Sequence, residues 1–297
     1  MPRVRMTGSR AGNGAQGLVA VAGADQAAGL RSLLKRRSLR LLAVLGDHEG
    51  GTPGACAAQL ALGLARAGHN VVLLDAAGSA LDALALHGVG DLADLMDGGF
   101  DFAQVAVRAA VGLRAIAACR GLPALIAADA AGADFFDGFM RLSEPPDLLV
   151  LSLPATAAPD GRLWLPLGGV AGESLLVMPP GERALTAAYA AIKQASAPAV
   201  EIAPAFRILV NGAAGERDAR ALCRQLSDTA RRFLGVAVGY AGNVPRNARG
   251  QIFGAGTGAA TAPHAEAARA FARIAAEVPG WRLAECLHEP STTTHTH

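Results

Sequence analysis

Residues 41–56, LLAVLGDHEGGTPGAC, hold the pattern that decides the fold. The apolar run 41–45 is typical of a buried strand, and the glycine-rich turn after it leads into an apolar helical stretch. A strand, a glycine-rich turn and a helix N-terminus together form an anion site, because backbone N–H groups point inward and the helix dipole favours negative charge. We therefore expect the body of the protein to begin as a phosphate-binding domain does.

The rest of the chain continues this alternation. Apolar runs predict further strands at 71–74, 148–153, 174–178, 207–210 and 236–240. Helical patterns lie at 55–67, 182–196, 216–234 and 264–278. Strands that alternate with helices predict an α/β fold with a doubly wound, mostly parallel sheet and helices on both faces.

The glycine-rich turn lacks the side chains that phosphate chemistry needs. A P-loop supplies a Lys for the β- and γ-phosphates and a Ser or Thr for Mg²⁺, but Gly54, Ala55 and Cys56 stand at those positions. Pro53 has no backbone N–H to offer, and Lys35 and Lys193 are the only lysines of the chain. We interpret the turn, with Gly50 and Gly51, as a degenerate nucleotide loop.

The composition of the chain indicates the cellular environment in which we expect the protein. The 297 residues are 52% hydrophobic and 18% charged, but no apolar stretch is both long enough and free enough of Gly, Pro and charge to predict a membrane span. Four scattered cysteines form no metal-ligand spacing, so we expect a cytoplasmic protein without a metal site. Residues 1–40 carry eight Arg or Lys and one acid, a net charge of +7, whereas residues 41–297 carry −5.

Over residues 24–280 the chain resembles the MinD/ParA-type P-loop ATPases, and among them the flagellar-number regulators of the FlhG/FleN type. Val71-Val72-Leu73-Leu74-Asp75 is similar to the family's strand L-L-D-A-D, although Ala77 replaces the second acid. Residues 207–211, RILVN, resemble the strand whose terminal Asn reads adenine. Residues 148–152, LLVLS, end in Ser152 where the family has Asp. The resemblance implies residual nucleotide contacts through Asp75 and Asn211.

The most specific resemblance lies before the body. Residues 25–31, DQAAGLR, match the D-Q-A-x-x-L-R arm of the flagellar branch, in which this arm binds and stimulates FlhF, a GTPase of the signal-recognition type. The partner-binding residues that it implies are Asp25, Gln26, Ala27, Leu30 and Arg31. An ordinary N-terminal helix that caps the body is the alternative interpretation.

Two hypotheses about function follow. In the first, the chain is a non-hydrolysing adaptor of the flagellar system with no cofactor, which holds FlhF and basal-body or transcription-regulator proteins. In the second, it is a switch that still binds ATP or ADP weakly and serves another polar or membrane-associated machine. Neither hypothesis includes nucleic-acid binding; both allow peripheral membrane contact at most, with recruitment to the cell pole as a further expectation.

We divide the chain into a disordered tail (1–23), a partner-binding arm with a basic linker (24–40), the α/β body (41–280) and a polar tail (281–297). The helix near the end of the body admits two interpretations. Phe271, Ile274 and Val278 recur at helical spacing, with Trp281 one turn further, which predicts a helix that faces the sheet. The family carries a membrane-targeting helix near its C-terminus, which is the competing interpretation.

Overall fold

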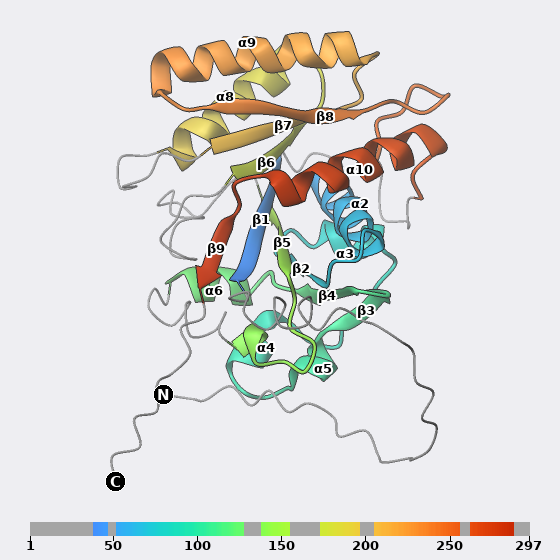
Figure 1. Cartoon of the computed structure of the whole chain (residues 1–297), viewed down its shortest axis with the longest axis vertical. Coiled ribbons are helices and arrows are strands. Elements are labelled where there is room, and N and C mark those ends of the chain that lie inside the picture. Colours follow the sequence, from blue (N-terminus) through green and yellow to red (C-terminus); the bar gives the residue numbers. More distant parts are fainter. Residues whose placement is uncertain are drawn as a thin grey trace, which may run out of the picture.

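A mixed sheet whose strands mostly run parallel organises the protein (Figure 1). The computed structural model describes residues 38–46, 52–127, 138–154, 173–196, 205–255 and 262–287. Its strands are β1 (Ser38–Gly46), β2 (Val71–Asp75), β3 (Val107–Ala110), β4 (Leu113–Ala117), β5 (Leu148–Pro154), β6 (Glu173–Met178), β7 (Ala205–Asn211), β8 (Val238–Val244) and β9 (Ala284–Leu287). The described helices are α2 (Thr52–Arg66), α3 (Ser79–Ala83), α4 (Leu92–Met96), α5 (Phe102–Val105), α6 (Gly121–Ala127), α8 (Glu182–Ala195), α9 (Glu216–Leu234), α10 (Ala265–Glu277) and the 3-10 turn η1 (Val278–Gly280).

The strand order is β3-β4-β2-β5-β1-β6-β7-β8, with β9 paired to β1 outside that path. The pairs β3–β4 and β1–β9 are antiparallel, and the others are parallel. Parallel pairing brings the carboxyl ends of β1, β2, β5 and β7 to one edge of the sheet. Ligands of open α/β sheets bind at this edge, so it is the edge on which the candidate site has to be sought.

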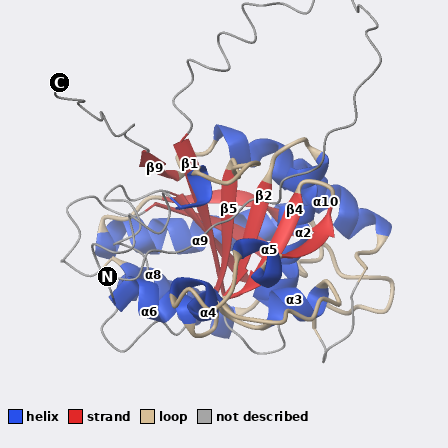
Figure 2. Ribbon diagram, turned by 90° about the horizontal axis from the view of Figure 1, so that it is seen from below, coloured by secondary structure: helices blue, strands red, loops and turns tan. Residues whose placement is uncertain are grey.

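Helices cover both faces of the sheet, as Figure 2 shows. On one face, α4, α5, α6, α8 and α9 contribute to a core with Leu74, Leu149 and Ile208. On the other face, α2, α3 and α10 contribute to a second core with Val44, Leu73 and Val150. Successive strand residues alternate between the two cores because side chains alternate across a strand. The doubly wound, mostly parallel α/β fold predicted from the sequence is confirmed.

Helix α10 packs its apolar face against the sheet and against α2. Phe271, Ile274 and Val278 are buried in the second core, and Trp281 is 5% exposed. The helices α10 and α2 approach so closely that a Cβ atom on Gly63 would lie 2.8 Å from the Cβ atom of Ala275. The prediction that this helix faces the sheet is therefore confirmed.

Four strands depart from the expected arrangement. The antiparallel hairpin β3–β4 was missed, because β3 is a half-buried edge strand with no apolar run. Strand β9 extends the sheet past residue 280, where we placed the end of the body, and β1 begins at Ser38, inside the expected linker. The two meet as neighbours, with Ser38 opposite Leu287.

No helix within the described residues combines the length and the apolar character that crossing a bilayer requires.

Trp281 gives a test of this arrangement, because two arginines hold it in place. The guanidinium of Arg207 lies 4.8 Å from the centre of the indole ring, and Arg40 donates a hydrogen bond of 2.9 Å to the Trp281 carbonyl. We expect Trp281→Ala to lower the free energy of unfolding by about 3–5 kcal/mol, since it empties a buried aromatic site. Urea unfolding followed by circular dichroism measures the change.

The matched control is Phe233→Ala, because Phe233 is 66% exposed. We expect this variant to lie within about 0.5 kcal/mol of the original chain. Equal losses in the two variants would contradict the burial of Trp281 against the sheet.

Candidate functional site

The first turn of α2, where a phosphate would bind, is buried by the protein itself. Thr52, Pro53, Gly54, Ala55 and Cys56 are all buried. The backbone N–H groups of a helix start attract anions only where the anion can reach them. Three neighbouring segments close over this helix start: the end of β1, the start of α3 and the turn at residues 253–254.

Helix α3 begins directly against Gly54. A Cβ atom on Gly54 would lie 2.8 Å from the backbone nitrogen of Ala80 and 2.8 Å from the carbonyl carbon of Ser79. Carbon and nitrogen atoms do not pack at such distances, and backbone atoms cannot rotate away as a flexible side chain can. No side chain larger than hydrogen fits at position 54 without a shift of α3, and the position that the resemblance assigns to the phosphate lysine has no space for one.

Asp75 holds α3 in this place. Its carboxylate accepts hydrogen bonds of 2.8 Å from the backbone N–H groups of both Ala80 and Leu81, and one of 3.2 Å from Ala77. Burial raises the pKa of the Asp75 carboxyl, while the three N–H donors act in the opposite direction. The carboxylate thus binds the first turn of α3. In the register of β2 and β5, Ser152 lies opposite Asp75.

The turn at residues 253–254 closes the other side of α2. A Cβ atom on Gly254, whose φ is 76°, would lie 2.6 Å from the Cβ atom of Ala55. The side chain of Phe253 packs edge-on against Phe271 of α10, with ring centres 5.2 Å apart. The turn is therefore anchored in the second core and seated on the start of α2.

Asn211, at the end of β7, is bound to the same turn. Its side-chain nitrogen donates a hydrogen bond of 2.8 Å to the carbonyl oxygen of Phe253 and contacts the sulfur of Cys56 at 3.7 Å. The residue is only 1% exposed. Burial also raises the pKa of the Cys56 thiol strongly, which keeps that group protonated and unreactive.

The structure brings five of the sequence-predicted site residues together at the carboxyl edge of the sheet: Gly54, Ala55, Cys56, Asp75 and Asn211. Gly50 and Gly51 of the loop lie outside the described residues, as do Asp25, Gln26, Ala27, Leu30 and Arg31 of the arm. Their predicted roles therefore remain predictions.

These residues do not fit Mg²⁺–ATP. Position 54 has no space for a lysine, position 56 offers a buried thiol in place of a hydroxyl, and the Asp75 carboxylate is already engaged by three amides. Within the described ranges, no group of three or more His, Cys, Asp or Glu side chains is placed to hold a metal ion.

Sequence reasoning missed the residues that fill the site. Ser79, Phe253 and Gly254 carry no motif, and Phe253 is 42 positions away from Asn211, the residue that it contacts. The only signal was indirect: the glycine at position 54 and the alanine at position 55 admit neighbours that larger side chains would exclude.

The chain is similar in sequence to a protein of known role. The antiactivator FleN of Pseudomonas aeruginosa is 29% identical over 251 residues, which cover 82% of this chain and 88% of FleN. No protein-family model matches the chain.

Solved structures share the fold at low identity. MinD of Aquifex aeolicus aligns with a TM-score of 0.55 and 15% identity over 80% of this chain and 97% of its own. The ParA-family ATPase of Chlorobium tepidum aligns with a TM-score of 0.55 and 14% identity over 82% of this chain and 99% of its own. Over most of its length the chain is thus similar in sequence to FleN, and it shares the fold of MinD and ParA.

Proposed function

We propose that this chain is a regulator that acts by binding other proteins and does not hydrolyse ATP. The observation that carries the proposal is the contact between Gly54 and the start of α3, which leaves no space for the lysine that P-loop chemistry requires. Phosphoryl transfer depends almost entirely on positioned charges. Loss of one such group typically costs about 3–4 kcal/mol of transition-state stabilisation, and here the lysine, the Mg²⁺ hydroxyl and two acids are all replaced.

The second hypothesis, a switch that binds nucleotide weakly, depends on Asp75 and Asn211. Both side chains are buried: the Asp75 carboxylate accepts hydrogen bonds from the start of α3, and the side-chain nitrogen of Asn211 donates to Phe253, whereas the side-chain oxygen of Asn211 has no partner among the described residues. A nucleotide that used either the Asp75 carboxylate or the Asn211 side-chain nitrogen would have to compete with these contacts. The geometry therefore supports the adaptor over the switch.

The partners that we propose are inferred from the sequence of the arm and from the similarity to FleN. The D-Q-A-x-x-L-R arm favours a GTPase of the FlhF type, and the similarity to FleN, an antiactivator, favours a transcription regulator as a second partner. An arm that meets its partner outside the body needs no nucleotide chemistry inside it. We therefore assign this chain to the control of flagellar biosynthesis, as an adaptor with a filled nucleotide site.

Steady-state phosphate release tests the lack of turnover. We expect the full chain with Mg²⁺–ATP to give only background release, unchanged in the Asp75→Asn variant, which keeps one acceptor oxygen for α3. A contaminating ATPase would not respond to that substitution. A rate that saturates with ATP and falls in Asp75→Asn would contradict the proposal, and calorimetric binding of ATP without turnover would favour the switch.

Substitution of Gly54 tests the filled site directly. We expect Gly54→Ala to lower the free energy of unfolding by about 1–3 kcal/mol, because the added methyl group overlaps the backbone of Ser79 and Ala80. Gly280→Ala is the matched control, since a Cβ atom there has no neighbour within 4 Å. If urea unfolding shows equal stability for both variants, α3 does not close over position 54.

The arm is tested by GTP turnover of a purified FlhF-type GTPase. We expect the full chain to stimulate turnover, and both the Gln26→Ala/Arg31→Ala variant and a deletion of residues 1–34 to leave it at the basal rate. Arg31 would supply a charge-assisted hydrogen bond to the partner. Circular dichroism should show an intact body in both. Undiminished stimulation by both variants would remove the arm from the proposal.

A further inference from the structure

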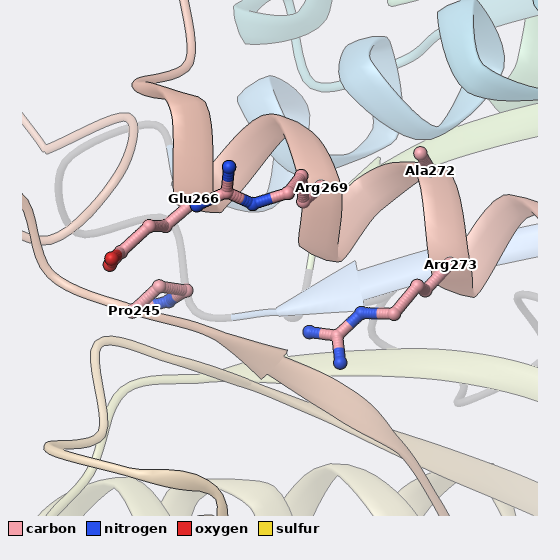
Figure 3. A pocket seen from close by; sticks show the side chains of 5 residues that line it. All are labelled: Pro245, Glu266, Arg269, Ala272 and Arg273. Atoms are coloured by element: carbon pink, nitrogen blue, oxygen red, sulfur yellow. The ribbon is translucent and has the colours of Figure 1, made fainter.

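A hollow of about 590 Å³ lies beside α10, away from the buried nucleotide position. It is lined by Pro245, at the end of β8, and by Glu266, Arg269, Ala272 and Arg273 of α10 (Figure 3). Strand β8 is the last strand of the main sheet order, so among the described strands only β7 pairs with it. The hollow therefore borders the end of an edge strand.

Two arginines face this hollow together. Arg269 and Arg273 are exposed, stand one helical turn apart and both line the hollow. In Figure 3 the side chain of Arg273 extends from α10 toward β8, and that of Arg269 lies along α10 beside Glu266. Neither makes a hydrogen bond or an ion pair with any part of the chain that the structure describes. Two like charges at this spacing repel each other, so an anion that meets both would relieve the repulsion.

The remaining lining restricts the kind of anion. Pro245 and Ala272 offer apolar surface, and the carboxylate of Glu266 lies at one end of the hollow, on the side of Pro245 (Figure 3). A continuous polyanion, such as nucleic acid, would be repelled by Glu266. A peptide with a few carboxylates between apolar residues would complement both the two arginines and the apolar surface. Its backbone N–H groups could donate hydrogen bonds to the carboxylate of Glu266.

The spacing specifies the peptide further. Side chains four residues apart on a helix have Cβ atoms about 5–6 Å apart. Alternate residues of an extended chain lie on one side, about 6.6 Å apart. We propose that this hollow binds an extended acidic segment of a partner protein, with carboxylates at alternate positions that pair with Arg269 and Arg273.

A fluorescent peptide in which Glu alternates with Val is the probe. We expect the full chain to raise its fluorescence anisotropy at physiological salt, and to leave unchanged that of a peptide with Gln in place of each Glu. Arg269→Gln/Arg273→Gln should weaken binding about tenfold, because it removes two charge-assisted contacts. Arg269→Lys/Arg273→Lys should retain part of the affinity, since it keeps both charges but not the planar fork.

The matched control is Arg217→Gln/Arg224→Gln, which removes two exposed arginines from α9 and should bind like the original chain. Thermal unfolding verifies that all variants are folded. The proposal is overturned if the original chain does not distinguish the Glu peptide from the Gln peptide, or if both double-Gln variants lose the same affinity. It is equally overturned if Arg269 and Arg273 are required for binding to vesicles of anionic phospholipid but not for binding to the peptide.

Discussion

The buried carboxylate of Asp75 is the interaction on which the candidate site depends. It stands at the carboxyl end of β2 with its side chain fully buried, and it accepts two short hydrogen bonds from the first turn of α3. A helix start leaves its first N–H groups without partners inside the helix, and Asp75 satisfies two of these in a region that water does not reach. The contact fixes where α3 begins, and the start of α3 in turn fixes how close Ser79 comes to Gly54.

Asn211, like Asp75, binds a neighbouring segment of the chain, on the opposite side of α2. Its side chain could present donors and an acceptor to a ligand at the edge of the sheet, but its nitrogen instead binds the carbonyl of Phe253. A polar group in this environment needs a partner because an unsatisfied buried donor costs about 1–3 kcal/mol. Residues that the resemblance assigns to the nucleotide thus stabilise segments of the chain itself.

The sheet could be predicted from the sequence because its central strands are buried on both faces. Such strands appear as continuous apolar runs, as in residues 148–153, and their alternation with longer helical patterns identified the fold class. Strand β9 has no such run, since Glu285 interrupts it, and it forms only because β1 offers a free edge at Ser38–Leu41. The degenerate loop could also be predicted, since it follows from residue types at fixed spacing. The burial of this loop's helix start by α3 and the 253–254 turn could not be predicted from the sequence. Ser79 and Phe253 reach this region through packing between segments that are far apart in the chain.

A filled nucleotide position changes where regulation can act in this fold. In a nucleotide-dependent switch, the free energy that separates two conformations comes from differential binding of the ligand. In the proposed function, the packing of α3 and the 253–254 turn on α2 takes the place of that ligand. The proposed function then places control at partners bound outside the nucleotide position: at the arm, whose sequence favours a GTPase, or beside α10, where two arginines lack partners in the described chain.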